Sequence, residues 1–202
     1  VAGNVAVSAG SIDVTGDIAF AGGTITAGVD QDYHDAVTMA TDVAMNAAGD
    51  VTFDTTVDGP GGLAIDAANT TFSGAVGSID ALAALSTTGN TNIFGGSVDT
   101  VGLQTYGDGT SPLAATDAVV IGGDTVLTGE NITFNSTVDE DTTGGLLRAT
   151  LTTNATTTTF NGDVGTAALG ALIVNGDTAN NASQILTLDG QTYNGDVALG
   201  GG

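Results

Sequence analysis

The chain has 202 residues and a formal net charge of −22 at pH 7, because 23 acidic residues face a single strong cation, Arg148. Such a charge repels nucleic acid phosphates and anionic lipid headgroups, so neither nucleic acid nor a membrane is an expected partner. The absence of cysteine excludes disulfides and thiolate metal sites, and no apolar run reaches the ~18 residues of a membrane-spanning segment.

The composition predicts an all-β fold in one domain that spans residues 1–202. Glycine contributes 32 residues and threonine 34, Asp outnumbers Glu by 21 to 2, and lysine is absent. These residues favour strands and turns, whereas most strong helix formers are nearly missing. Mean hydropathy is positive, at +0.26, so the chain does not have the low hydrophobicity of disordered proteins and is expected to fold.

In chain order, the aromatic residues indicate a short repeat. A valine follows most of them four residues later, as in "FDTTV" at Phe53 and "FNGDV" at Phe160. Phe20 fits with one inserted residue, and Tyr106 has threonine at the valine position. The residues that we expect in the repeated core are Phe20, Tyr33, Phe53, Phe72, Phe94, Tyr106, Phe134, Phe160, Tyr193, Val57, Val76, Val98, Val138 and Val164.

A longer unit is superimposed on the short one. The segments "QDYHDAV", "QTYGDGT" and "QTYNGDV" begin at Gln31, Gln104 and Gln191, at intervals of 73 and 87 residues. "VTFDTTVD" and "TTFSGAVG" follow the first segment, and "ITFNSTVD" and "TTFNGDVG" follow the second in the same order. A fixed order of similar segments, subdivided near 20 residues, indicates a repeat architecture.

The hydrophobic period predicts strands with one buried face, because segments such as "SIDVTGDIAF" alternate apolar and polar residues. In F-x-x-x-V we expect the aromatic to end one strand, three small residues to turn a corner, and valine to begin the next strand. Coils of about 20 residues would then stack in parallel about 4.8 Å apart, with Phe on Phe from coil to coil. An antiparallel β-sandwich with regularly spaced aromatics is the alternative.

The blocks "QTYNGDV", "TFNSTVD" and "TTFNGDVG", set among Thr/Asn/Gly-rich strands, resemble the repeats of filamentous-haemagglutinin-like exoproteins and autotransporter passengers. These are large secreted bacterial surface proteins, and the resemblance extends over nearly the whole chain. It implies a right-handed parallel β-helix (β-solenoid) and an extracellular or cell-surface location. It implies little about activity, because unrelated functions share this scaffold. The family's amino-terminal secretion signature is not visible, so the export route is inferred by analogy alone.

Catalytic chemistry has few candidates. His34 lies in the polar segment "QDYHDAV" and is expected at a surface turn, and Arg148 is expected to pair with an aspartate or to lie over a coil end. G-x-S-x-G, H-E-x-x-H and a phosphate loop are absent. Paired carboxylates could hydrolyse a neutral glycan, but the carboxylates here are spread over turn positions, as expected if they only solvate the outside. We therefore expect no enzyme, with no catalytic and no cofactor-binding residue.

Calcium is the ion that the sequence suggests. Oxygen-only clusters suit this hard cation, which would also reduce repulsion among the carboxylates. Neither an EF-hand loop nor a glycine-rich calcium nonapeptide is present, so diffuse counterion binding is the alternative to a specific site. The candidate ligands are Asp30, Asp32 and Asp35 in one cluster and Asp139 and Asp141 in another, with Glu140 beside them and a looser pair at Asp13 and Asp17.

Two further surface properties remain open. Five N-x-S/T sequons would carry glycans if the source organism glycosylates surface proteins, and ranks of threonine on a flat face would favour ice binding. Thr24 with Thr26 and the run at 156–159 suggest such ranks, but these do not recur once per coil. The sequon asparagines are Asn69, Asn131, Asn135, Asn154 and Asn181.

We expect a structural or adhesive role, that of an extracellular β-solenoid that builds or projects a cell-surface filament. Exposed strand edges at the ends of a solenoid are templates for another copy. The expected partners are therefore further copies in an end-to-end homopolymer, or neighbouring repeats of a longer protein. The alternative is a β-helix that binds or cleaves a host or cell-surface glycan, which needs a groove with exposed aromatics. The near-absence of Lys and Arg predicts one main trypsin site, after Arg148.

Overall fold

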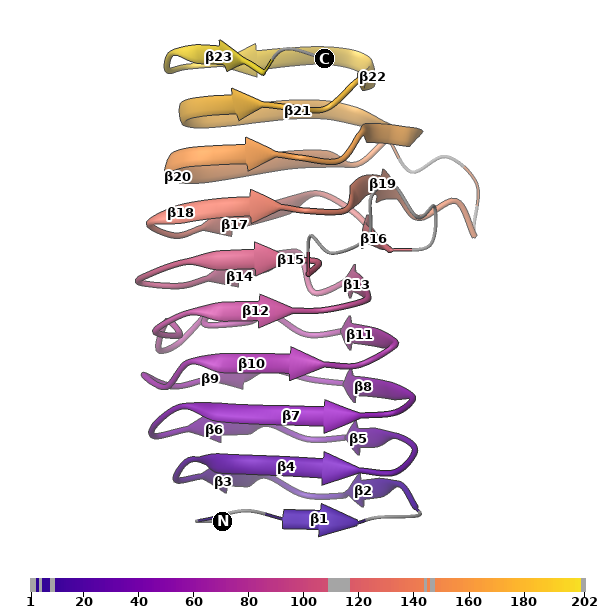
Figure 1. The fold of residues 1–202 in the computed structure, drawn as a ribbon, viewed down its shortest axis with the longest axis vertical. Coiled ribbons are helices and arrows are strands. Elements are labelled where there is room, and N and C mark those ends of the chain that lie inside the picture. Colours follow the sequence, from indigo (N-terminus) through magenta and orange to yellow (C-terminus); the bar gives the residue numbers. More distant parts are fainter. Residues whose placement is uncertain are drawn as a thin grey trace.

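The computed structural model describes residues 3, 5–7, 10–108, 117–143, 145 and 148–200. Over these residues the backbone forms no helix and winds into a right-handed β-solenoid of about nine turns, with each coil stacked on the one before (Figure 1). Every pair of described strands is parallel, with partners roughly 20 residues apart in the first coils. This confirms the parallel β-solenoid and excludes the antiparallel sandwich. No described helix is available to cross a membrane.

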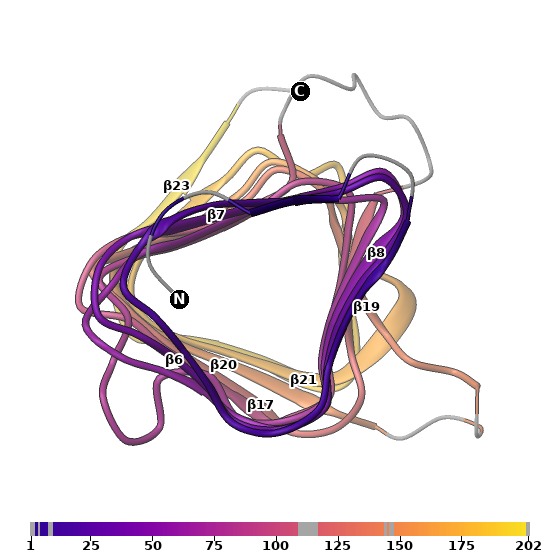
Figure 2. The same ribbon diagram turned by 90° about the horizontal axis from the view of Figure 1, so that it is seen from below.

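Each coil has three sides, and the end view is a triangle (Figure 2). We name the sides A, B and C in the order in which the chain passes through them. Side A contains β1 (Val5–Val7), β4 (Gly23–Ala27), β7 (Val43–Ala47), β10 (Leu63–Asp66), β12 (Leu85–Thr87), β15 (Gln104–Tyr106), β18 (Asn131–Phe134) and β23 (Val197–Leu199). Side B contains β2 (Ile12–Val14), β5 (Gln31–Tyr33), β8 (Asp50–Phe53), β11 (Asn69–Phe72), β13 (Asn90–Ile93), β16 (Ala118–Ile121) and β19 (Thr137–Glu140). Side C contains β3 (Ile18–Phe20), β6 (Val37–Met39), β9 (Val57–Asp58), β14 (Ser97–Asp99) and β17 (Thr125–Thr128).

Three longer strands continue around corners in the last coils. β20 (Thr150–Phe160) covers side C and then side A, because Leu151 pairs with Thr125 of β17 and Phe160 pairs with Phe134 of β18. β21 (Val164–Asn180) covers sides B, C and A in succession, and β22 (Ile185–Tyr193) covers B and C. The triangular winding is therefore the same from the first described coil to the last.

The interior is filled by alternate residues of each strand. In β6, Val37 and Met39 are buried while Thr38 between them is exposed, and in β10 Leu63 and Ile65 are buried on either side of an exposed alanine. Burying each such side chain contributes roughly 1.5–3 kcal/mol. One coil alone has no partner for its inward face, so this stabilisation depends on the coils above and below it.

The F-x-x-x-V segments turn corners as the sequence predicts. Phe53 ends β8 on side B and Val57 begins β9 on side C, with the three residues between them forming the corner. Val57 bridges in parallel to Val76 of the next coil, and Val76 bridges to Val98. The buried valines of these segments are Val57, Val76, Val98, Val138 and Val164.

The aromatic rings form two separate stacks, each of three rings. The N-terminal stack consists of Tyr33, Phe53 and Phe72, and the C-terminal stack consists of Tyr106, Phe134 and Phe160. Centroids lie 5.2 and 5.3 Å apart in the first and 5.3 Å apart in the second, with the planes within 14° of parallel. Phe therefore lies on Phe from coil to coil within each stack, as the sequence predicts, but the first stack lies at the corner between sides B and C and the second at the corner between A and B.

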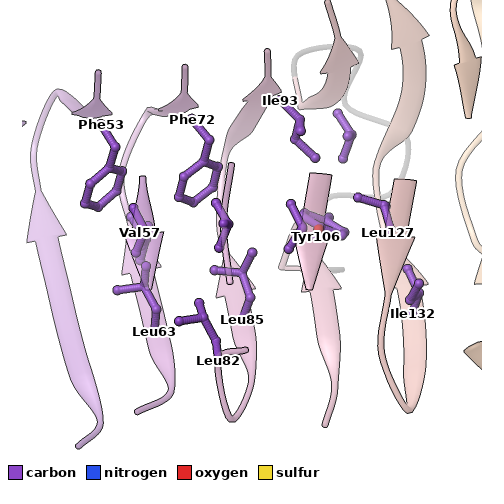
Figure 3. Close-up of a cluster of buried hydrophobic side chains, with 14 of the residues drawn as sticks. Phe53, Val57, Leu63, Phe72, Leu82, Leu85, Ile93, Tyr106, Leu127 and Ile132 are labelled. Atoms are coloured by element: carbon purple, nitrogen blue, oxygen red, sulfur yellow. The ribbon is translucent and has the colours of Figure 1, made fainter. Parts of the chain in front are cut away.

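Phe94 is not a core residue, which corrects the sequence prediction. Its side chain is 45% exposed, whereas Ile93 is fully buried and pairs with Phe72 of the coil below. Ile93 ends β13 with its side chain inward, and the extended backbone that continues from it turns Phe94, the next residue, outward, where its ring lies over Gly122. Figure 3 shows Phe53, Phe72 and Ile93 in one row and Tyr106 outside it. Phe20 is buried and meets Tyr33 edge-on at 5.9 Å.

The two stacks are related by a displacement of eleven sides. Phe53 on β8 and Phe134 on β18 are eleven sides apart, and so are Phe72 on β11 and Phe160 on β20. Since a coil has three sides, eleven sides make three coils and two further sides, so each recurrence falls one corner earlier. The Gln-x-Tyr segments accordingly lie on all three sides: Gln31 on B, Gln104 on A and Gln191 on C.

The Gln-x-Tyr segment makes the same hydrogen bonds at each corner. The tyrosine hydroxyl donates to Oε1 of the glutamine two residues earlier, and the glutamine Nε2 donates to the carbonyl six residues earlier. The hydroxyl distances are 2.9 Å for Tyr33, 2.9 Å for Tyr106 and 3.0 Å for Tyr193, and the Nε2 bonds reach Ile25, Val98 and Ile185. Gln31 and Gln104 are fully buried, whereas Gln191 in the last coil is exposed.

Candidate functional site

The predicted calcium ligands are mostly engaged with the backbone of neighbouring coils. Oδ1 of Asp30 accepts the N–H of Asp50 at 2.9 Å, and Oδ2 of Asp35 accepts the N–H of Gly16 at 2.7 Å. Asp32 lies on β5, paired with Asp13 and Thr52 of the adjacent coils. The carboxylates of Asp30 and Asp35 therefore connect coils at the two ends of β5, with Asp32 on the strand between them.

The second predicted cluster is arranged in the same way. Oδ1 of Asp139 accepts the N–H of Ala167 at 2.7 Å and Oδ2 accepts the hydroxyl of Thr137 at 2.9 Å, whereas Asp141 accepts both the N–H and the hydroxyl of Thr143. The hydroxyl bond, followed by the N–H bond, lowers the pKa of Asp141. Within the described residues no three acidic or histidine side chains gather in a way that could hold a metal ion. Calcium binding stays a prediction, which titration calorimetry and melting in calcium against EDTA would test.

Hydrogen bonds between aspartate carboxylates and the backbone of neighbouring coils are a regular feature that the sequence analysis did not predict. In each case an aspartate oxygen accepts a backbone N–H from the next coil, at 2.8–3.0 Å. The pairs are Asp42 with Gly62, Asp58 with Ile79, Asp124 with Thr150, Asp163 with Ser183, and Asp177 with Asp196. Several of these aspartates come directly before a strand, as in Asp42–Val43 and Asp163–Val164. That adjacency is the signal that could have identified them.

His34 is placed at the surface, as the sequence predicts, and connects three coils. Its Nδ1 lies 2.6 Å from Asp54 of the coil above and its Nε2 lies 3.3 Å from Asp13 of the coil below, with the imidazole 43% exposed. The hydrogen bond to Asp54 raises the pKa of His34, and the charges of Asp13, Asp54 and Asp32 act in the same direction. The arrangement favours the protonated imidazolium.

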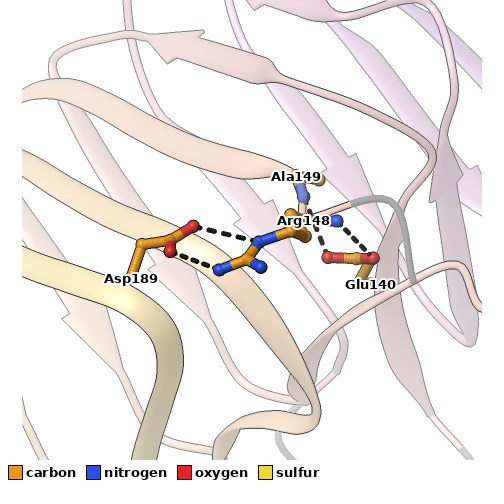
Figure 4. Close-up of polar contacts among 4 residues, drawn as sticks. All are labelled: Glu140, Arg148, Ala149 and Asp189. Atoms are coloured by element: carbon orange, nitrogen blue, oxygen red, sulfur yellow. Dashed lines mark hydrogen bonds and ion pairs between the residues drawn. The ribbon is translucent and has the colours of Figure 1, made fainter.

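Arg148 pairs with an aspartate, as expected, and belongs to a larger contact (Figure 4). Its guanidinium contacts Asp189, 41 residues later, with Nε donating to Oδ2 at 3.3 Å. Glu140, which is only 3% exposed, accepts the backbone N–H groups of Arg148 at 2.8 Å and Ala149 at 2.9 Å. The buried carboxylate of Glu140 therefore holds the backbone at Arg148 and Ala149, directly before β20. The expectation that the carboxylates only solvate the outside is wrong for Glu140.

Asparagine ladders occupy corners of the solenoid and include four of the five sequons. In each ladder Nδ2 of one residue donates to the side chain or backbone of the coil before it. The sequon donors are Asn69 to Asp50, Asn135 to Gly107, Asn154 to Thr128 and Asn181 to Asn161, at 2.6–3.4 Å. Asn131 begins β18. Glycosylation at all five positions stays a prediction that intact mass would test.

A shallow groove of about 590 Å³ crosses the outer surface of side A over β4, β7, β10, β12 and β15. One small residue per coil forms its floor, and Leu103 stands at its rim, 50% exposed. The floor consists of Thr24, Ala44, Ala64, Ser86 and Thr105, which pair in that order. The lining holds one carboxylate, Asp42, and no aromatic ring, and the mixed floor is not the regular threonine rank that ice binding needs.

The fold and these contacts define the chain as a β-solenoid repeat protein. No family model matches the chain, and no curated protein and no solved structure matches it. The resemblance to filamentous-haemagglutinin-like and autotransporter repeats is thus supported at the level of the β-solenoid architecture. Membership of that particular class stays a prediction.

Proposed function

We propose that the protein is a structural segment of an extracellular filament, either building it or projecting an adhesive tip from a cell surface. The observation that carries this proposal is the uniform stacking of about nine coils, in which the buried side chains of every side contact the coils above and below. A solenoid of constant cross-section is a rod whose length is set by the number of coils. Rod-like extension is the property that a filament needs.

The polar residues support the same role. Asp and Asn side chains at the corners satisfy backbone or side-chain groups of adjacent coils, so they reinforce the rod along its axis. One arginine and no lysine leave a single site for trypsin-like proteases, which suits a protein exposed outside the cell. Neither feature requires a catalytic centre.

Electron microscopy of the purified chain at neutral pH and physiological ionic strength tests the proposal. We expect unbranched fibres one solenoid wide, whose number increases with protein concentration. Particles that stay one solenoid long at every concentration and ionic strength would overturn the filament role. A chain with Leu199→Asp, which places a charge on the last described strand, is a matched control that should form fewer fibres.

Glycan binding is the second candidate, and the groove on side A is the observation that favours it. The groove extends over five coils, but its lining has no aromatic ring to stack on a sugar. A polysaccharide panel tests this role, with Ala64→Arg as the comparison because Ala64 is exposed in the middle of the groove floor. Binding that the substitution abolishes would support the glycan role, and no binding to any polysaccharide would contradict it.

A further inference from the structure

The peptide bond between Arg148 and Ala149 joins an exposed side chain to a closed backbone. Trypsin-like proteases cleave after Lys or Arg, and Arg148 is the single residue of either type in the chain. Its side chain is 57% exposed, but Ala149 is only 2% exposed and leads directly into β20. Exposure of the arginine alone would predict rapid cleavage, so the state of the backbone decides whether a protease can reach the bond.

Hydrogen bonds occupy the backbone on both sides of this bond. The N–H groups of Arg148 and Ala149 donate to the two carboxylate oxygens of the buried Glu140, at 2.8 and 2.9 Å (Figure 4). The carbonyl of Ala149 accepts the N–H of Gly170 at 2.8 Å. An extended peptide is recognised as an added strand through these same main-chain groups. They must therefore be released before the bond can enter a protease cleft.

The carbonyl at the bond is covered by the coil above. Gly170 lies in β21 and packs so closely that a Cβ at this position would collide with both the carbon and the oxygen of the Arg148 carbonyl. A protease nucleophile must approach that carbon to form the tetrahedral intermediate. The native stacking of the coils therefore blocks the attack.

Arg148 has a strained backbone that its contacts maintain. Among the described residues other than glycine it is the one with a positive φ, at +58°. A side chain with a Cβ is unfavourable there, and such a conformation persists only where its surroundings hold it. Glu140 holds the backbone, and Asp189 accepts Nε of the guanidinium at 3.3 Å. Loss of either contact should favour local opening.

We propose that the Arg148–Ala149 bond is a latent processing site for a trypsin-like protease, closed while Glu140 holds the backbone and cleaved when that hold is released. Glu140 is the gate residue. The ion pair with Asp189 is a weaker restraint, because both of its side chains are more than half exposed and solvent screens their attraction. This site goes beyond the filament role and does not depend on it, since it concerns one bond of the single chain.

Cleavage adds one water molecule across the bond. The carbonyl carbon of Arg148 takes the oxygen and becomes a carboxylate, and the nitrogen of Ala149 takes both hydrogens and becomes an ammonium group. That nitrogen lies 2.9 Å from Oε2 of Glu140 in the intact chain. The gate residue is thus placed to pair with the new positive charge, and charge-assisted hydrogen bonds are stronger than neutral ones.

The cut leaves the rod in one piece, because the strands on both sides of it belong to stacked coils. β20 begins directly after the bond and pairs with β17 and β18 of the coil below. β19 precedes the bond and pairs with β21 of the coil above, through Val138 and Val164. The fragments 1–148 and 149–202 should therefore remain together as one particle.

Limited digestion with trypsin tests the gate. The natural chain, Glu140→Ala, Glu140→Gln and Asp189→Asn are digested under conditions in which circular dichroism shows each of them folded, and intact mass identifies the products. Phe53→Ala is the matched control, because it removes a buried ring in β8 and lowers the stability of the rod without a contact to Glu140. When opening is fast relative to cleavage, the rate of digestion reports the population of the open form.

We expect the natural chain to persist and Glu140→Ala to be cut between residues 148 and 149 at least about tenfold faster. A hydrogen bond to a charged acceptor corresponds to about a factor of ten or more in an opening equilibrium. Glu140→Gln should be intermediate, and Asp189→Asn and Phe53→Ala should each be accelerated much less than Glu140→Ala. If Glu140→Ala does not fold, Glu140→Gln takes its place in the comparison with Phe53→Ala.

Equal rates for the natural chain and the Glu140 variants would overturn the gate. Equal acceleration in Phe53→Ala would also overturn it, because cleavage would then follow general unfolding, and a larger effect of Asp189→Asn would assign the restraint to the ion pair instead. Size-exclusion chromatography of the cut chain should give one peak that contains both fragments, and separate peaks would contradict a cut rod that stays in one piece. These measurements use dilute single chains, so failure of the gate leaves the filament role untouched.

Discussion

The N-terminal and C-terminal aromatic stacks are made from the same sequence blocks but occupy different corners of the triangle. Tyr33 and Phe53 stack between sides B and C, and Tyr106 and Phe134 stack between sides A and B, with nearly equal ring separations. The block therefore specifies a strand, a corner and a following strand, and not a particular corner. The three sides are interchangeable environments, and a sequence unit of eleven sides can rotate around the rod without loss of packing.

The stacks differ in the chain length between their rings. Tyr33 and Phe53 are 20 residues apart, whereas Tyr106 and Phe134 are 28 apart and Phe134 and Phe160 are 26 apart. The C-terminal rings nevertheless stack at the same separation of 5.3 Å. Loop length costs little entropy once the coil itself is closed. Stacking is thus set by strand register and not by a constant coil length.

Truncating the middle ring of each stack is the strongest test of this equivalence. Phe53→Ala and Phe134→Ala each remove a fully buried ring that stacks on both faces, and each should cost about 3–5 kcal/mol of unfolding free energy. The two losses should agree within about 1 kcal/mol, given the usual context dependence of such substitutions. Denaturant unfolding followed by circular dichroism measures both.

Phe94→Ala is the matched control, because Phe94 is a phenylalanine directly after β13 with its ring outside. It should change the unfolding free energy by less than about 0.5 kcal/mol, apart from a small further loss where the ring no longer contacts Gly122. A large loss at Phe53 with a small one at Phe134 would show that the corners are not equivalent.

The buried Glu140 distinguishes the C-terminal region and gives the next largest effect. Glu140→Ala removes the acceptor of two N–H groups, and hydrogen bonds to charged groups are worth about 1.5–3 kcal/mol each. We expect a loss in that range, together with faster hydrogen exchange at the amides of Arg148 and Ala149. Glu140→Gln keeps one acceptor oxygen and should lose less. Unchanged exchange in the alanine variant would contradict the role of Glu140 in holding this segment.

Much of this architecture could be predicted from the sequence, because alternation and F-x-x-x-V are local. The coil, the corners and the buried valines depend only on which residues point inward and where the chain bends. The corner at which a block falls could not be predicted, since "TFDTTV" and "TFNSTV" make the same local structure on any side. The outward position of Phe94 depends on its neighbour Ile93 pairing with Phe72, which is a contact between coils.

The polar contacts could not be predicted either, because they too are contacts between coils. An aspartate before a strand reads as a solvated turn residue until the coil above is placed, and only then does its oxygen meet an N–H, as for Asp42 and Gly62. Glu140 was expected to join an exposed acidic cluster with Asp139 and Asp141. In the structure it is buried and accepts the N–H groups of Arg148 and Ala149, which lie directly before β20.

The Gln-x-Tyr segment allows the buried and exposed copies of one motif to be compared. Gln104→Ala leaves the Tyr106 hydroxyl without its acceptor inside the rod, which should cost about 1–3 kcal/mol, whereas the Thr128 carbonyl keeps the N–H of Thr100. Gln191→Ala removes the same local bonds where water replaces them, so its effect on the isolated chain should be close to zero. Thermal melting of dilute samples measures both, and equal losses would mean that burial of the motif is not what makes it stabilising.

Apart from the control variants, the smallest effect is expected at His34, which lies beside the N-terminal stack and has no counterpart in the C-terminal one. Its pKa is raised above 6.5 in the folded chain, first by Asp54 and then by the charges of Asp13 and Asp32. A raised folded pKa means that the stabilisation is fully present below the unfolded value and is lost as the pH rises through the folded value. The melting temperature of the natural chain should therefore exceed that of His34→Gln most below the unfolded value of about 6.5, and the difference should shrink as the pH rises through the raised pKa. A difference that stays constant with pH would indicate that the imidazole acts only by packing or by neutral hydrogen bonds.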